Sequence, residues 1–256
     1  MASALPRAVF APPPSLPAAC CLNHTHDAYR LAQSIAGVAT PGTLLDIGCG
    51  SGNVSIPVLL ARRDLRVVGV EVSAAAAAVS QGRAVQHRVA DRFDVVVGDA
   101  LDIGLPHGRS VVSNPPMLPT EPWFSLPSPE GGEMLFWMAL VRRVAAWPEV
   151  ADVWLHLFDF QGVGRRSGSF PTVEELASAE GFEVGYPHRG WRAVGPGSAI
   201  AAALPALRRL FPAAMANLNG IDVRFADLPD EPRGPVLIRH SIVRLHRALR
   251  VPGDLR

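Results

Sequence analysis

Five short apolar runs, each ending at a glycine, an acidic residue or a polar turn, recur in the chain up to residue 158. Runs that are apolar throughout are typical of parallel strands buried on both faces. They predict strands over 43–47, 66–71, 93–97, 110–113 and 152–158, with helices over 23–36, 52–62, 73–85 and 133–147. This alternation predicts an α/β fold of the Rossmann-like type, with helices on both faces of the sheet.

The last third of the chain has a different pattern. Thr172 and Glu175 form a capping box that predicts a short helix, and a sixth strand is expected to begin at Phe182. Alternating apolar and basic residues over 236–249 predict an antiparallel edge strand. The segment 187–235 is longer than a hairpin requires, so we expect a substrate-side insertion before the last strand.

Composition bounds the class of protein. The chain has 256 residues and a net charge of +1, with no block of like charges, which weakens the case for a long nucleic-acid partner. Residues 1–22 are rich in proline and alanine and predict a flexible arm, which leaves 23–256 as a single domain. No apolar run reaches the roughly 18 residues of a membrane span. We expect a cytoplasmic, bacterial protein without a membrane partner. Cys20, Cys21 and Cys49 offer no zinc spacing, so no metal is predicted.

The first strand runs into a turn in which Gly48, Gly50 and Gly52 alternate with other residues. Glycine adopts positive φ without strain and lets the backbone approach a ligand closely. A dinucleotide fingerprint requires glycine or alanine at the sixth position, where this chain has Asn53. Glu71, at the end of the second strand, can accept from ribose hydroxyls of either a dinucleotide or another adenosine cofactor.

Two later motifs distinguish these cofactors. Asp99 comes after the third strand, and Asn114-Pro115-Pro116 comes after the fourth. Together with the glycine turn led by Asp46, this order resembles motifs I and IV of the amino-methylating branch of the class I S-adenosylmethionine-dependent methyltransferases. The resemblance covers about residues 24–160. It implies a seven-stranded methyltransferase sheet and S-adenosylmethionine as the cofactor.

The resemblance also implies roles for individual residues. The side-chain oxygen of Asn114 and the carbonyl of Pro115 are expected to be catalytic, because both can accept hydrogen bonds from the acceptor nitrogen. The expected cofactor-binding residues are Asp27, Asp46, Gly48, Gly50, Glu71, Asp99 and Ala100. The expected substrate-binding residues are Pro116, Met117, Trp123 and Phe124. Spacing assigns no role to His107, His156, His188, Arg189, Trp191 and Arg192.

The acceptor is predicted from the residue type directly after the second proline. The nucleic-acid and glutamine enzymes of this branch usually have an aromatic residue there, whereas this chain has Met117. Methionine covers a planar group less specifically. The resulting interpretation is an N-methyltransferase that acts on a small metabolite or natural-product intermediate. The alternatives are a glutamine amide in a protein, as in the release-factor enzymes, a purine in RNA, and a non-catalytic module that only binds S-adenosylmethionine.

Overall fold

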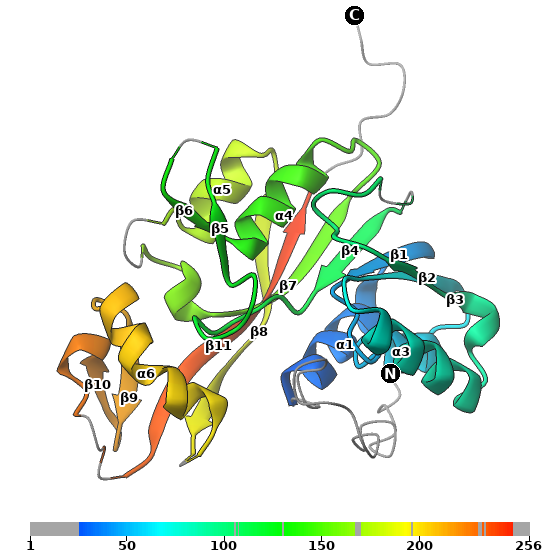
Figure 1. Ribbon diagram of the computed structural model, residues 1–256. Helices are drawn as coiled ribbons and strands as arrows, with labels where there is room; N and C mark the ends of the chain where they lie inside the picture. The colour runs from blue at the N-terminus through cyan, green and yellow to red at the C-terminus, as the bar shows by residue number, and fades with distance from the viewer. Residues whose placement is uncertain are drawn as a thin grey trace, which may run out of the picture.

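The computed structural model describes residues 26–104, 106, 108–129, 131–166, 170–195, 197–229, 232 and 234–247, and the predicted arm over 1–22 lies outside them. One mixed sheet with flanking helices organises these residues (Figure 1). The α/β prediction is therefore confirmed. None of the helices in the described part of the chain is both long and apolar enough to cross a membrane.

The parallel half of the sheet has five strands. They are β1 (Gly42–Ile47), β2 (Leu65–Glu71), β3 (Phe93–Val97), β4 (Ser110–Ser113) and β7 (Asp152–Phe158), in the spatial order β3-β2-β1-β4-β7. All seven residues of β7 are buried; five are apolar, and the other two are Asp152 and His156. The carboxyl ends of β1, β2 and β4 meet at one edge, where ligands bind in open α/β sheets.

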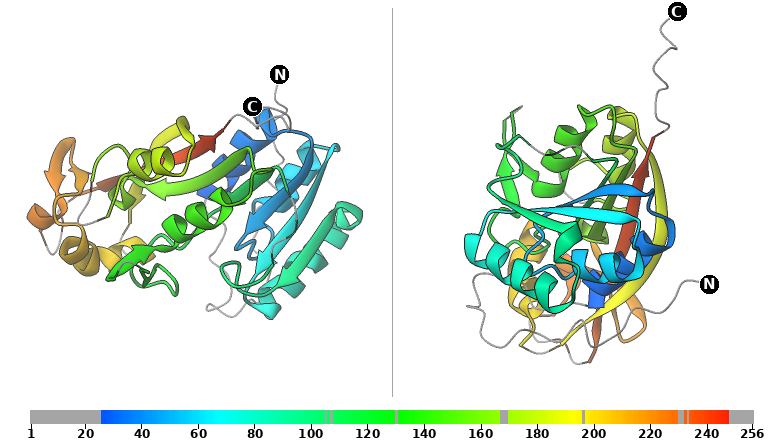
Figure 2. Two further views of the ribbon diagram at one scale, coloured as in Figure 1. Left: turned by 90° about the horizontal axis from the view of Figure 1, so that it is seen from above. Right: turned by 90° about the vertical axis from the view of Figure 1, so that its right-hand side faces the viewer.

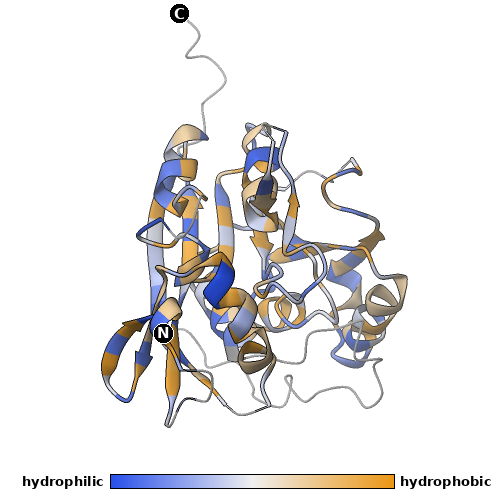
Figure 3. Ribbon diagram, turned by 60° about the vertical axis from the view of Figure 1, so that its left-hand side comes forward, coloured by the Kyte–Doolittle hydropathy of each residue, from blue (hydrophilic) through white to orange (hydrophobic). Residues whose placement is uncertain are grey.

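Helices cover both faces of this sheet (Figure 2). The helices are α1 (His26–Val38), α2 (Ser55–Ala61), α3 (Ala74–Gln86), α4 (Phe136–Ala145), α5 (Val173–Ala179) and α6 (Ala199–Leu210). Single 3₁₀ turns follow α3, β7 and β10, at Ala90–Arg92, Asp159–Gln161 and Phe225–Asp227. Successive residues of β1 face opposite layers: Leu44 belongs to the core that includes Leu31 of α1, and Leu45 to the core that includes Leu140 of α4. Apolar and polar residues alternate along the helices, as expected for helices that pack one face on a sheet (Figure 3).

The C-terminal part of the sheet is antiparallel. β11 (Val236–His246) pairs with β7, with β8 (Glu183–Val194) and, at its start, with β9 (Met215–Leu218), which pairs in turn with β10 (Ile221–Arg224). The prediction of an edge strand is therefore wrong, because β11 has partners on both sides. Seven strands form the expected sheet, and β9 and β10 extend it to nine within the described residues.

Three predicted boundaries need correction. The expected insertion over 187–235 begins later, because β8 continues through Val194; α6, β9 and β10 form the remainder. The helix expected from 133 begins at Phe136, because Glu133–Leu135 is β6, which pairs with β5 (Ser125–Pro127). The helix expected from 52 begins at Ser55, because the glycine turn occupies the residues before it.

Candidate active site

The glycine turn after β1 requires its glycines. Gly48, Gly50 and Gly52 have φ values of +72°, +53° and +78°, a region that other residues rarely adopt. Gly48 N–H donates to the Val70 carbonyl at 2.8 Å, and Gly50 N–H donates to Oε2 of Glu71 at 2.8 Å. Glu71 therefore ties the end of β2 to the turn, and its other oxygen accepts from Ser73 N–H at 2.9 Å.

Asp46 lies fully buried at the base of this turn. Its Oδ2 accepts a short hydrogen bond from the Ser55 hydroxyl at the start of α2. Burial raises the pKa of Asp46 to about 7; the Ser55 hydrogen bond opposes this rise, and the nearby Glu71 carboxylate adds to it. Near neutral pH, Asp46 is therefore present in both its neutral and its ionised form, and a cationic ligand nearby would favour the ionised form.

Two residues that sequence reasoning did not single out hold the turn from α3 and β2. The buried Arg83 donates to the Ser51 carbonyl at 2.6 Å and to Oδ1 of Asn53 at 2.8 Å. A Cβ at Gly69 would lie 2.6 Å from Sγ of Cys49, so only glycine admits that buried thiol. Asn53, which departs from the dinucleotide fingerprint, is therefore a partner of Arg83.

The Asn-Pro-Pro turn comes directly after β4. Ser113 donates its hydroxyl hydrogen to the Ile47 carbonyl at 2.8 Å, which joins the ends of β4 and β1. Oδ1 of Asn114 lies 3.0 Å from Nδ1 of His156 on β7. Glu121 accepts from the backbone N–H groups of Met117 and Leu118, the latter at 2.9 Å. Because Glu121 is largely buried, its pKa is raised. The carboxylate thus stabilises the loop after Pro116, a role that no spacing revealed.

A cavity of about 530 Å³ connects these parts. The predicted residues that line it are Asp46, Gly48, Gly50, Glu71, Asp99, Ala100, Asn114, Pro115, Pro116 and Trp123. Glu121 and Phe136 also line it, although sequence reasoning missed both. Among the described lining residues, four are acidic and none is basic. This lining suits the sulfonium and ammonium groups of S-adenosylmethionine and opposes the pyrophosphate of a dinucleotide.

Individual lining groups fit the remaining parts of that cofactor. Oδ1 of Asp99 accepts from Leu101 N–H at 2.8 Å, which fixes the carboxylate at the end of β3 for donors such as an adenine amino group. Ala100 beside it is small and nearly buried. Trp123 is 47% exposed at φ +60°, a conformation that is rare for a bulky residue. It therefore presents an aromatic face at the cavity.

Three other predicted residues lie elsewhere. Met117 and Phe124 are buried in the core of the α4 face, where Phe124 packs edge-to-face against Phe211 at 6.2 Å between ring centroids. The Asp27 carboxylate pairs with Arg192 at 2.7 Å, and it is the next residue, Ala28, that lines the cavity. A contact of Asp27 with cofactor, and of Met117 or Phe124 with substrate, stays a prediction.

Comparison with known proteins agrees with this geometry. Residues 29–121 match the family model described as the methyltransferase small domain. The release factor glutamine methyltransferase of Chlorobaculum tepidum is 36% identical over 107 residues, which are 40% of this chain and 36% of that protein. The candidate ribosomal RNA small subunit methyltransferase A of Methanosarcina mazei is 36% identical over 81 residues, 32% of this chain and 28% of that protein. The chain thus spans about a third of the length of these curated relatives.

A solved structure supports the fold over a larger part of the chain. A candidate RNA methyltransferase of Pyrococcus horikoshii superposes with a TM-score of 0.51 at 15% identity, covering 86% of this chain and 83% of that one. At this identity the likeness establishes the Rossmann-like sheet and nothing about the acceptor.

Proposed function

We propose that this chain, whose residues 29–121 match the methyltransferase small domain, uses S-adenosylmethionine to methylate a planar nitrogen, the side-chain amide of glutamine in a protein. The observation that carries the proposal is the position of Asn114 and Pro115 in the wall of the acidic cavity, beside Asp46, Glu71 and Asp99. A nitrogen bound there lies next to the site that suits the cofactor, as methyl transfer requires.

The chemistry of an amide explains why these residues are needed. Its nitrogen is a weak nucleophile, because its lone pair is delocalised into the carbonyl group. Oδ1 of Asn114 and the carbonyl of Pro115 accept hydrogen bonds from the two N–H groups of the amide. These hydrogen bonds turn the nitrogen lone pair out of conjugation with the carbonyl group. The cofactor supplies an electrophilic methyl group. Asn114 and Pro115 would hold the nitrogen with its lone pair toward that methyl group, and the surplus proton of the methylated nitrogen would pass to water. Pro115 and Pro116 fix φ and keep the acceptors in place.

Three observations favour a protein amide over a small metabolite. The expectation of a metabolite rested on Met117, but Met117 is 6% exposed and belongs to the core, so its replacement of an aromatic residue says little about the acceptor. The exposed ring of Trp123 provides the apolar surface at the cavity. A relative that is 36% identical over 107 residues is named as a release factor glutamine methyltransferase.

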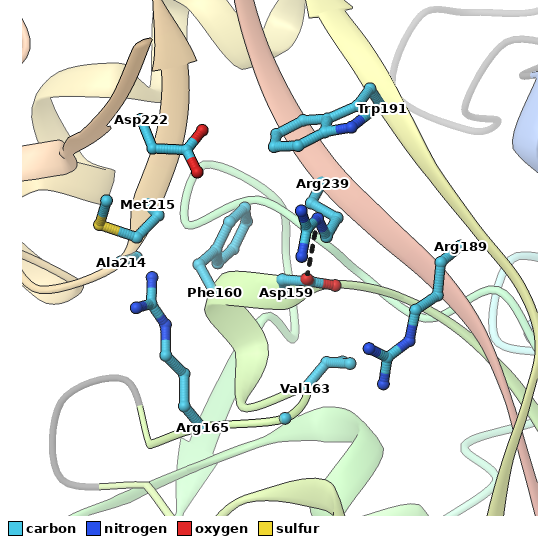
Figure 4. Close-up of a pocket in the computed structure, with 11 residues that line it drawn as sticks. Asp159, Phe160, Val163, Arg165, Arg189, Trp191, Ala214, Met215, Asp222 and Arg239 are labelled. Atoms are coloured by element: carbon cyan, nitrogen blue, oxygen red, sulfur yellow. Dashed lines mark ion pairs between the residues drawn. The ribbon is translucent and has the colours of Figure 1, made fainter.

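A second cavity favours an RNA purine as the second candidate. It has a volume of about 330 Å³, and Arg165, Arg189, Arg239 and Trp191 extend into it (Figure 4). The Arg239 guanidinium lies 4.6 Å from the centre of the Trp191 ring and pairs with Asp159 at 3.9 Å. Arginines interleaved with an exposed aromatic ring suit phosphates and stacked bases.

The position of this second cavity supports the same candidate. Asp159 comes directly after β7, and Asn114 comes directly after β4, its parallel neighbour. Each cavity is therefore lined by a residue at the carboxyl edge of the sheet, Asp159 in one and Asn114 in the other.

The test supplies labelled S-adenosylmethionine with a release factor, with ribosomal RNA and with no acceptor, and then uses digestion and mass spectrometry. We expect methylglutamine in the release factor. Asn114→Ala should lower kcat about 10²- to 10³-fold while the cofactor still binds, because Asn114 acts on the acceptor. Label in RNA alone, lost in the double variant Arg189→Gln/Arg239→Gln, would replace the proposal with the second candidate. Full turnover by Asn114→Ala would refute the role of the Asn-Pro-Pro turn.

A further inference from the structure

Three buried side chains from different elements meet behind Asn114. Asp27 comes from α1, His156 from β7 and His240 from β11, and each is at most 3% exposed. One nitrogen or oxygen atom from each lies within 4.8 Å of the others. Since the methyl-transfer chemistry above does not use Asp27 or His240, their convergence needs a separate explanation.

The distances within this triad have a specific geometry. Nε2 of His156 lies at hydrogen-bond distance, 2.9 Å, from Nδ1 of His240, and Oδ1 of Asp27 lies 4.0 Å and 3.8 Å from these two nitrogens. The circle through the three atoms has a radius of about 2.1 Å, which is the length of a zinc–nitrogen bond. We propose that Asp27, His156 and His240 bind a divalent transition-metal cation of the zinc type.

The carboxylate supplies the first independent support. Oδ2 of Asp27 pairs with Arg192 at 2.7 Å, but Oδ1 is buried without a hydrogen-bond partner among the described residues. An ionised oxygen buried in this way is strongly unfavourable. It faces the two imidazole nitrogens from beyond hydrogen-bond distance, so a cation between the three atoms satisfies it.

The state of His156 supplies the second support. Oδ1 of Asn114 can only accept, so Nδ1 of His156 carries the ring hydrogen and Nε2 directs its lone pair toward the triad. A histidine that binds a metal usually donates its other N–H to an oxygen acceptor, and Asn114 is such an acceptor here.

The surroundings of His240 leave room for this arrangement. A Cβ on Gly190 would lie 2.9 Å from Nε2 of His240 and 3.0 Å from Nε2 of His188. Glycine at this position of β8 therefore admits both rings. His188 contacts the outer side of His240, since its ring centroid lies 5.6 Å away, and it is not a member of the triad.

The triad is linked to Asn114 through His156, although it takes no part in methyl transfer. A cation held by Nε2 of His156 would fix that ring and, through Nδ1, the Asn114 amide that faces the acceptor. Asp27 and His240 are thus positioning residues. Because cation binding is measured without methyl acceptor, failure of the proposed glutamine activity and failure of this proposal are distinguishable.

The test titrates chelator-treated protein with Co²⁺, whose visible absorption reports nitrogen and oxygen ligands, and then displaces Co²⁺ with Zn²⁺. We expect one equivalent bound and a higher melting temperature. His240→Gln and Asp27→Asn should each weaken binding at least about 100-fold. His188→Gln, a matched histidine outside the triad, should bind as the wild type does. Arg192→Gln should bind more tightly, because it removes a cation paired with Asp27.

The opposite results would overturn the proposal. Absence of a visible Co²⁺ spectrum in the wild type, or equal losses in His188→Gln and His240→Gln, would show that the triad is only a hydrogen-bonded cluster. Weaker binding by Arg192→Gln would do the same. Circular dichroism confirms that each variant is folded, and the partly exposed Arg192 provides a test even if the buried variants do not fold.

Discussion

We expect Asp46 to make the affinity for S-adenosylmethionine depend on pH. Its pKa of about 7 means that about a tenth of the free protein carries the Asp46 charge at pH 6 and about nine tenths at pH 8. If the ionised form binds the cationic cofactor, the apparent affinity falls in proportion to that fraction. The dissociation constant of S-adenosylmethionine should therefore be about tenfold lower at pH 8 than at pH 6. Asp46→Asn should bind weakly at both pH values.

Calorimetry at both pH values, with S-adenosylmethionine and S-adenosylhomocysteine as ligands and NAD as the control, tests this prediction. The α-amino group of the ligand titrates with either protein, so the difference between wild type and Asp46→Asn isolates Asp46. Asp64→Asn is a matched control, because Asp64 pairs with Arg62 at the surface. Two results would refute the reasoning. One is a change in dissociation constant between pH 6 and pH 8 that is the same in wild type and in Asp46→Asn. The other is tight binding by Asp46→Asn.

The remaining predictions concern stability. The folded protein raises the pKa of Asp46 above the ordinary value of 3.8. The free energy of unfolding without ligand should therefore fall by up to about 4 kcal/mol as pH rises from about 4 to about 7. Urea titrations of wild type and Asp46→Asn measure this fall. Gly69→Ala should cost about 1–3 kcal/mol and weaken cofactor binding, because its Cβ displaces Cys49, whereas Gly37→Ala in α1 meets no neighbour and should not destabilise. Thr172→Ala should cost about 1 kcal/mol in the same assay by removing the capping box of α5; an unchanged midpoint would contradict that role.

Local patterns predicted the parallel half of the sheet with small errors. The strand over 93–97 and the strand over 152–158 were placed to the residue, because both are short runs rich in β-branched and aromatic residues. The three glycines of the turn were identified because positive φ restricts the residue type. The capping box at Thr172 is likewise a local interaction, and both of its hydrogen bonds are present.

Elements that depend on distant partners were placed less well. The alternating pattern of β11 indicated a strand, but not its place between β7 and β8, since alternation is the same at an edge and inside an antiparallel sheet. The helix expected from 133 lost its first turn to pairing with β5. The insertion was placed eight residues too early, because β8 has the same alternating pattern as a surface segment.

The sequence by itself determined the α/β class and the ligand-binding turn, because both depend on residues close together in the chain. It also determined the positions of Asp46, Glu71, Asp99 and Asn114 at strand ends. Tertiary structure alone decided that Met117 is a core residue, that Glu121 stabilises the Asn-Pro-Pro loop and that Asp27 meets His156 and His240. Those three ligand candidates are separated by 129 and 84 residues in the chain. No local spacing encodes such a site, because only the packing of α1 against β7 and β11 brings it together.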